Sequence, residues 1–377
     1  MTPLSKRRLV HAGLLLAASW MAVFRMHKII VNILFPLSIQ LKTSRSVVSI
    51  VENESNSNST FCPLLQQQQQ QRRQDGPVPR SVAICGIQKG GRPYLEEWID
   101  YNKLLGFDKI YLYDNSNDFE LQNWTYNPDA ILDIRHFPGQ KKQLPAYREC
   151  ASRIRREGLH TWVAFLDLDE FLVLKQHNYV FEMIDYVIQQ QICKKEQPIR
   201  IGGIAVNWYM FDYNDHITYQ PLPLTYRFQR REVNINPHVK TIVNMAHYKK
   251  PISPHAFSYS GNADALDTDG DVLPYPTWFH DHGPTDVAVL HHMNVKSVEE
   301  YHQRCARGRA DAIDGVKNKK STMLPLYCRS PQEILTNFES TAATAKEANQ
   351  LVMDSTAWDL LVTRMPEKYG NVTTLSL

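Results

Sequence analysis

From residue 81 onward, apolar and polar positions alternate in blocks that predict strands and helices in turn. Short apolar runs closed by polar residues are typical of buried strands, and they occur at residues 81–87, 108–114, 130–137 and 161–171. Two longer segments predict helices that end at Gly106 and Gly158. Strands that alternate with helices indicate an α/β fold, with a Rossmann-like, mostly parallel sheet covered by helices on both faces.

Polar side chains follow the predicted strands at their carboxyl ends. Ligands of open parallel sheets bind beyond this edge, so these side chains should share one rim of the sheet. They are Gln88, Lys89, Asp114, Asn115, Asp167 and Asp169. The sequence therefore predicts a binding site along that rim.

The segment WVAFLDLDEF, residues 162–171, is an apolar run that ends in three carboxylates. Side chains alternate along a strand, so Asp167 and Asp169 should lie on one side of the chain and Glu170 should point away. Hard carboxylate oxygens suit Mg²⁺ or Mn²⁺, which also bind phosphate oxygens. Such an ion can stabilise a diphosphate as it leaves a sugar. The alternative is a solvated acidic turn at the end of a strand.

The first 79 residues differ in composition and predict three segments. The basic residues 1–8 would form a cytosolic tail, and the apolar residues 9–33 a signal-anchor transmembrane helix. Residues 34–79 contain a run of glutamines and predict a disordered stem. A cleaved signal peptide or an organellar targeting segment is the alternative to the anchor.

This plan predicts a single-pass type II protein of the Golgi membrane. Residues 80–325 would be its lumenal folded domain, and residues 326–377 a helical extension. Sequons at Asn53 and Asn58 fall in the expected stem, and two more begin at Asn123 and Asn371. The contact with the membrane would be made by the N-terminal helix alone.

The composition excludes some partners and allows others. A formal net charge of +3 gives no support to a nucleic-acid partner. The six cysteines include no C-x-x-C pair, which argues against a zinc site built on thiolates. Their even number permits disulfides in a secretory compartment, but the pairing cannot be assigned from the sequence.

Six blocks of sequence resemble one family of sugar transferases. In order, they are CGIQKGGRPYLEEWIDYNKLLGFDKIYLYDN, GQKKQLPAYREC, WVAFLDLDEFL, NWYMF, HVKTIV and HHMNVKSVEEYHQRCARGRAD, between residues 81 and 315. In this order they resemble glycosyltransferase family 92 and related family-2-like transferases with a GT-A fold. Two places depart from the family: Gly90 and Gly91 follow Lys89 where Asn and Glu are usual, and Asp212 replaces a common glycine.

The resemblance implies a metal-dependent transferase that moves a sugar, expected to be galactose, from a UDP-sugar to a glycan or glycoprotein with inversion. It assigns donor binding to Lys89, Glu97, Asp114, Gln143, Asp167 and Asp169, and acceptor binding to Trp208 and Lys240. The ion, Mn²⁺ or Mg²⁺, would be held by Asp167, Asp169 and His291 or His292.

Structural alternatives stay open for several of these residues. Lys89 is equally consistent with a solvated loop, Glu97 with an ion pair on its helix, Asp114 with an Asx turn and Trp208 with the core. Further along, Ser297 to Glu300 predict a capping box. The arginines that follow, Arg304, Arg307 and Arg309, either face the diphosphate or are solvated, and the solvated surface is favoured.

A general base must take the proton of the acceptor hydroxyl. The candidates are Asp281, which we favour because FHDHGP looks like a loop near the site, with Asp215 and Glu232 as alternatives. Two other functions are compatible with the sequence: a glycan-binding module with a transferase-like fold and no catalysis, and a metal-dependent hydrolase that uses the histidines. The intact Asp-x-Asp argues against the first, because a lectin needs no diphosphate site.

Overall fold

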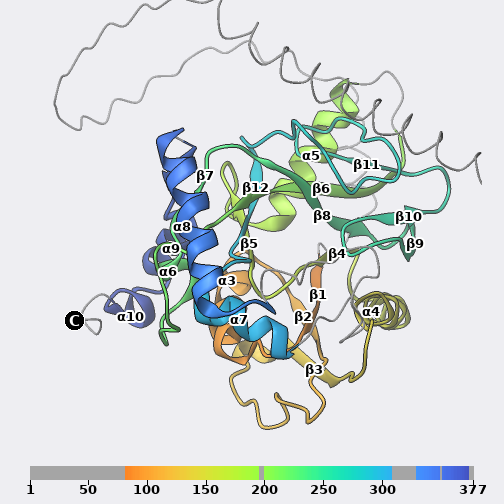
Figure 1. Cartoon of the computed structure of the whole chain (residues 1–377). Coiled ribbons are helices and arrows are strands. Elements are labelled where there is room, and N and C mark those ends of the chain that lie inside the picture. The colour runs from red at the N-terminus through yellow and green to blue at the C-terminus, as the bar shows by residue number, and fades with distance from the viewer. Residues whose placement is uncertain (1–80, 195–198, 308–327, 349, 373–377) are drawn as a thin grey trace, which may run out of the picture. The chain divides into compact units, whose positions relative to one another are not determined.

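The computed structural model describes residues 81–194, 199–307, 328–348 and 350–372 (Figure 1). The expected tail, anchor and stem, residues 1–79, lie outside this part of the chain. Within it, no helix is both long enough and apolar enough to cross a membrane.

A nine-stranded sheet forms the centre of the described domain. Its strands run in the order β3 (Leu132–His136), β2 (Lys109–Asp114), β1 (Val82–Gln88), β4 (Trp162–Phe165), β8 (Asn236–Asn244), β6 (Ile201–Met210), β12 (Ala288–His292) and β5 (Glu170–Leu174), and β11 (Asp264–Leu266) also pairs with β6. The pairs of β1 with β2 and β4, of β2 with β3, and of β6 with β11 and β12 are parallel. The three pairs β4–β8, β6–β8 and β5–β12 are antiparallel. The predicted α/β class with a mostly parallel sheet is confirmed, and the sheet is mixed.

Helices cover both faces of this sheet because its strands are apolar on both sides. In β1, Ile84 belongs to one buried cluster and Ala83 and Cys85 to another, as strand alternation requires. The helices α3 (Leu95–Leu104), α5 (Val180–Lys194) and α9 (Thr356–Arg364) cover the first face, and α4 (Gln143–Glu157) covers the second. Figure 1 shows α3 and α4 on opposite sides of β1.

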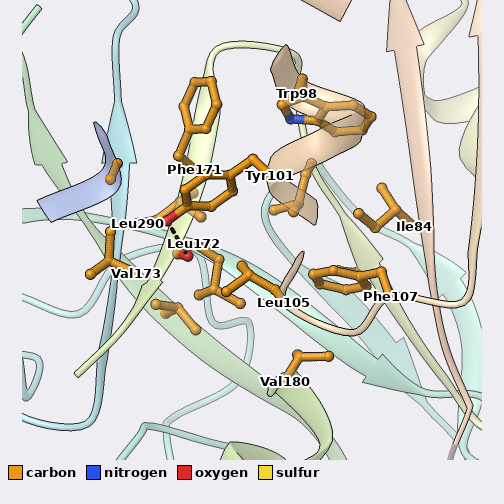
Figure 2. Close-up of a cluster of buried hydrophobic side chains, with 14 of the residues drawn as sticks. Ile84, Trp98, Tyr101, Leu105, Phe107, Phe171, Leu172, Val173, Val180 and Leu290 are labelled. Atoms are coloured by element: carbon orange, nitrogen blue, oxygen red, sulfur yellow. Dashed lines mark hydrogen bonds between the residues drawn. The ribbon is translucent and has the colours of Figure 1, made fainter. Parts of the chain in front are cut away.

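Two hydrogen bonds tie α3 to β5 within the larger cluster, and Figure 2 shows one of them, between Tyr101 and Leu172. The indole of Trp98 donates to the carbonyl of Glu170, and the hydroxyl of Tyr101 donates to the carbonyl of Leu172. The Tyr101 ring also packs edge-on against Phe171. Buried polar groups of aromatic side chains normally find such partners, and here they fix the start of β5 relative to the helix.

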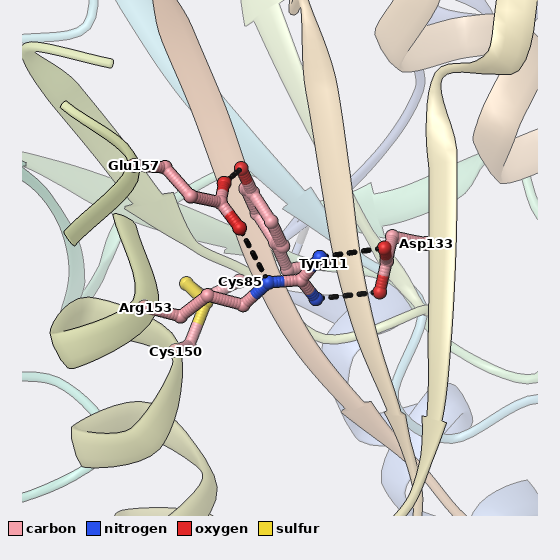
Figure 3. The surroundings of a disulfide bond; sticks show 6 residues. All are labelled: Cys85, Tyr111, Asp133, Cys150, Arg153 and Glu157. Carbon is pink, nitrogen blue, oxygen red and sulfur yellow. Dashed lines mark hydrogen bonds and ion pairs between the residues drawn. A yellow bond between two sulfur atoms is a disulfide. The ribbon is translucent and has the colours of Figure 1, made fainter. Parts of the chain in front are cut away.

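On the other face, a disulfide joins β1 to α4 through Cys85 and Cys150 (Figure 3). Next to it, the guanidinium of Arg153 makes two hydrogen bonds to Asp133 on β3 and one to Glu157. A bidentate ion pair between a guanidinium and a carboxylate combines charge with a fixed geometry. Together they hold α4 across the strands, with Gln143 at its N-terminal end.

The structure corrects one predicted element. Residues 161–171 were expected to form a single strand, but they form β4 and β5, which lie at different places in the sheet. The strand is interrupted at residues 166–169, where the carbonyl of Asp167 accepts a hydrogen bond from the backbone N–H of Glu170 in a turn. Asp167 and Asp169 lie in this break rather than at successive outward positions of one strand.

The remaining elements surround the sheet. They are η1 (Arg92–Tyr94), η2 (Pro128–Ala130), α6 (Leu224–Arg227), β7 (Arg230–Glu232), β9 (Tyr248–Pro251), β10 (Phe257–Tyr259), α7 (Val298–Arg307), α8 (Pro331–Glu347), β13 (Leu351–Met353) and α10 (Pro366–Tyr369). The expected capping box opens α7, since Ser297 and Glu300 bond each other's backbone N–H groups.

Candidate active site

The break between β4 and β5 opens into a cavity of about 450 Å³. It lies at the carboxyl ends of β1 and β4, as expected for a sheet of this kind. Both Asp167 and Asp169 line it, and their backbone lies between two strands that belong to the buried sheet. The other side chains of this cavity come from β1, α4, β6, β8, β12, α7 and the loops between them.

Asp167 is held from two sides. The amide of Gln143, at the start of α4, donates a hydrogen bond of 3.2 Å to one oxygen, and the Nζ atom of Lys240 on β8 lies 2.9 Å from the other. Glu170 supports the same carboxylate from behind, because its side chain accepts the backbone N–H of Asp167 and lies 3.4 Å from Lys240. Gln143 and Asp167 therefore form one unit at the edge of the cavity.

The ammonium group of Lys240 is taken out of water by this arrangement, since its side chain is 1% exposed and that of Glu170 is fully buried. Burial alone would lower the pKa of Lys240, but Asp167 and Glu170 raise it well above the ordinary value. The lysine therefore stays charged. Lys240 does not line the cavity, and it positions Asp167 from behind rather than facing an acceptor.

Asp169 has a different pair of neighbours. The Nζ atom of Lys296 lies 2.5 Å from one oxygen, and the Nε2 atom of His292 lies 3.6 Å from the other. Burial would raise the pKa of this carboxyl group, but Lys296 and His292 hold it well below its ordinary value. Asp169 is therefore an ionised carboxylate in the wall of the cavity.

Four basic side chains line the cavity: Lys89, Lys296, Arg304 and Arg307. We call them the cationic cluster. A smaller cavity of about 210 Å³ is lined by Lys296, Arg304 and Arg307 together with Gly90 and Tyr94. The sequence favoured a solvated surface for Arg304 and Arg307 over contact with a diphosphate, but both line the cavity, and burial lowers the pKa of Arg307. Arg309 lies outside the described residues.

At another part of its wall, the cavity is lined by Trp208 and three histidines. His238 stacks on the indole with the ring planes 12° apart, and His255 and His292 contact it edge-on. The indole N–H is buried and has no hydrogen-bond partner among the described residues. An aromatic surface with an unused donor suits the apolar face and hydroxyl groups of a sugar.

Two predicted donor residues, Glu97 and Asp114, lie outside the cavity and have structural partners. Glu97 accepts the backbone N–H groups of Leu224 and Thr225 at the start of α6. Asp114 accepts a hydrogen bond from the amide of Gln88, whose carbonyl oxygen in turn accepts the backbone N–H of Gly91. Both acids are buried, and the second shapes the loop that carries Lys89 without facing the cavity.

The two neighbouring histidines of β12 point to opposite faces of the sheet. His292 lines the cavity, whereas His291 lies 3.5 Å from Asp354 and packs against Phe211. Because His291 does not reach the cavity, it cannot join Asp167 and Asp169 around one ion.

None of the three acids proposed as general base lines the cavity. Asp281 is exposed on the loop that follows Phe279. Asp215 forms an ion pair with Arg230 and lies in another groove, beside α8. Glu232 is exposed at the end of β7. The role assigned to Asp281 therefore has no support from its position.

The donor atoms in the cavity fit a hard divalent cation. Asp167, Asp169 and His292 present two carboxylates and an imidazole, which are ligand types that Mn²⁺ or Mg²⁺ can use. Among the described residues, no group of three or more such side chains is close enough together to hold an ion unaided. The other ligands would have to be phosphate oxygens and water.

Several residues of the cavity were missed by sequence reasoning, notably Tyr94, His238, His255 and Lys296. For His238 a signal existed, because it stands two residues before Lys240 on a strand and should share its side. For His255 and Lys296, which lie in loops with no periodic pattern, the sequence has no comparable signal.

Part of the chain is similar to known sugar transferases. Residues 92–250 match the model of glycosyltransferase family 92. A glycosyltransferase family 92 protein of Ricinus communis is 33% identical over 102 residues, which cover 26% of this chain and 18% of the relative. Others from Arabidopsis thaliana and Oryza sativa subsp. japonica are 31% and 29% identical, over 27% and 26% of this chain and 18% and 19% of their own lengths.

These matches relate this part of the chain to glycosyltransferases. More closely, the chain contains a glycosyltransferase family 92 domain, and the resemblance seen in the sequence is confirmed. The matched part spans less than a fifth of the curated relatives. Among solved structures, a 4-diphosphocytidyl-2C-methyl-D-erythritol synthase aligns with 44% of this chain and 76% of its own, at 12% identity and a TM-score of 0.25.

Proposed function

We propose that the chain is a glycosyltransferase with a GT-A type fold that moves a sugar, galactose first among the candidates, from a UDP-sugar to a glycan or glycoprotein with inversion. The observation that carries this proposal is one cavity that holds both Asp167 and Asp169 and the cationic cluster. A nucleoside diphosphate is the leaving group that such a combination of charges suits.

The cationic cluster would bind the diphosphate and stabilise the charge that develops as it leaves. Arginine forks match phosphate oxygens in pairs, and a lysine supplies a compact positive charge. The electrostatic interactions of both side chains with phosphate are stronger in a partly closed cavity than in water. Gln143 and Lys240 would keep Asp167 in place during the same step. Mn²⁺ or Mg²⁺, held by Asp167, Asp169 and His292, would add charge stabilisation at the diphosphate.

Trp208 would form the platform on which the donor or acceptor sugar packs. Its side chain lines the cavity. The neighbouring His238, stacked on the indole, extends the same surface.

The test is a panel of nucleotide sugars offered to the purified folded domain with Mn²⁺, with and without glycan acceptors, while released UDP is measured. We expect release with one UDP-sugar, increased by the acceptor. If no donor gives release but glycans bind, the chain is a glycan-binding module, and the transferase proposal is overturned.

We also propose that the folded domain lies in the lumen of the secretory pathway, in the Golgi. The Cys85–Cys150 disulfide supports this, because such bonds persist in oxidising compartments. The exposed sequon asparagine Asn123 supports it as well. A glycosidase should increase the mobility of the expressed protein, by less in Asn123→Gln. An unmodified protein in a reducing compartment would contradict this location.

A further inference from the structure

The wall of the cavity contains no carboxylate that is free to act as a base among the described residues. Asp167 and Asp169 line it, but each faces a lysine, at 2.9 and 2.5 Å. The three acids considered from the sequence lie elsewhere. Transfer to a hydroxyl group needs a proton acceptor near the reacting atoms, so the histidines of the cavity are the groups to consider.

His255 is the histidine whose protonation is fixed by the backbone. Its Nδ1 atom lies 3.0 Å from the carbonyl oxygen of Val239 on β8. A carbonyl can only accept a hydrogen bond, so Nδ1 carries the proton and Nε2 keeps a lone pair. Among the described residues, Nε2 has no hydrogen-bond partner. For His238 the corresponding partner is Oδ1 of Asn236, which also accepts the backbone N–H of His238.

The backbone around His255 is also held firmly. Its own N–H and that of Ala256 bond the hydroxyl of Ser253, and its carbonyl accepts the hydroxyl of Thr241. The N–H, the carbonyl and the Nδ1 atom of His255 are thus all hydrogen-bonded, which keeps the ring in place without a ligand. A catalytic group needs such support, since small displacements are costly to the rate.

The position of His255 is linked to the two aspartates through a closed chain of contacts. Val239, which anchors His255, precedes Lys240, which bonds Asp167. On the other side, His255 contacts Trp208, Trp208 contacts His292, and His292 reaches Asp169.

We infer that His255 is the general base of the transfer reaction, and this role rests on the proposed function. Nε2 takes the proton of the acceptor hydroxyl while the oxygen attacks the anomeric carbon. The bond from that carbon to the diphosphate oxygen breaks, and its electron pair leaves with the UDP. The proton then passes from Nε2 to water, which returns the imidazole to its neutral form. No oxidant or reductant is required.

The charges around the ring agree with a neutral imidazole. Burial, together with the charge of Lys240, lowers the pKa of His255 to about 4, although Asp167 opposes the shift. His238, whose pKa is also lowered, is the other titratable group near the ring. At neutral pH the base is therefore ready to accept a proton. A bound diphosphate brings negative charge and should strengthen it.

The test uses His255→Asn and His255→Gln in the enzyme as it exists. Asparagine can keep an N–H donor for the Val239 carbonyl but has no atom at the Nε2 position, and glutamine provides the second variant if the first fails to fold. We expect kcat for transfer to fall about 100-fold or more, with the affinity for UDP within about threefold of the wild type. His247→Gln, outside the cavity, is the matched control and should keep its activity.

Two results would overturn the role of His255 alone. One is a variant that transfers sugar at a rate within about threefold of an active wild type. The other is a loss of UDP affinity and of transfer in parallel, which would mean that the residue only shapes the cavity. If the wild type itself releases UDP from no donor, the proposed function fails, and the role of His255 fails with it.

Discussion

Lys240 donates a hydrogen bond of 2.9 Å to Asp167 from a side chain that is almost entirely buried, while Asp167 itself reaches into the cavity. The same ammonium group lies 3.4 Å from Glu170, which has no exposed surface. A buried charge is tolerated only when it is paired. The candidate site thus depends on a lysine that has no contact with the cavity.

Lys240→Met should lower the free energy of unfolding more than substitutions in an active site usually do. It leaves the Glu170 carboxyl buried without its counter-charge, and removing one partner of a buried pair costs about 3 kcal/mol or more. Urea unfolding measures the loss. The double variant Lys240→Met with Glu170→Gln should recover part of it, because a neutral amide needs no cation. A loss below about 1 kcal/mol in the single variant would show that the pair is dispensable.

Gly90→Ala should weaken donor binding. Gly90 has a φ of +67°, and an added Cβ would lie 2.8 Å from Cδ of Arg307 in the cationic cluster. Gly158→Ala is the control, since its φ is +64° and no atom lies within 4 Å. Both should lose about 1 kcal/mol of stability from backbone strain. Only Gly90→Ala should raise the donor KM, and equal KM values would place Arg307 outside the donor site.

Arg307→Gln should raise the donor KM about tenfold or more, because it removes a charge that we assign to the diphosphate. The thermal transition should change little. Arg148→Gln, at an exposed position of α4, loses the same charge and should leave the KM unchanged. If the two variants bind the donor equally well, the cationic cluster does not contact it.

Glu300 makes stability depend on pH in the acid range. Burial would raise the pKa of its carboxyl group, but the guanidinium of Arg227, at 2.7 Å, and the hydroxyl of Ser297 lower it to about 2. The stabilisation is present above the ordinary pKa of about 4.5 and is lost as the pH falls toward 2.

Glu300→Gln should therefore lose roughly 3 kcal/mol relative to the wild type at pH 7, and the difference should shrink between pH 4.5 and 2.5. Unfolding in urea at a series of pH values measures it. Glu339→Gln removes an exposed carboxylate and should show no such trend. A difference that is constant over this range would rule out the low pKa.

The sequence predicted the first strands and helices well, because their signals are local. Apolar runs located β1, β2 and β3 closely, and Gly158 ends α4 with a φ of +64° as a helix-ending glycine should. The break between β4 and β5 was missed because Leu166, Leu168 and Phe171 continue the apolar run through it. That β5 pairs with β12 at the edge of the sheet is a long-range property that no local pattern contains.

The candidate site was predictable in part for the same reason. Lys89 directly follows β1, Asp167 and Asp169 lie in the short segment between β4 and β5, and all three line the cavity. Glu97 could not be judged from its neighbours, because the N–H groups it accepts belong to Leu224 and Thr225, far along the chain. The cationic side chain of Lys296 comes from a loop residue with a φ of +60°, and its approach to Asp169 depends on the tertiary fold.

The most direct test of the transferase proposal compares UDP release by two single variants, Asp167→Asn and Asp281→Asn. Lys240 keeps Glu170 as its partner in the first variant, so the thermal transition should stay near that of the wild type. We predict that acceptor-dependent UDP release falls about 100-fold or more in Asp167→Asn and remains in Asp281→Asn, which is exposed and outside the cavity. A folded Asp167→Asn variant that releases UDP as fast as the wild type would contradict the account.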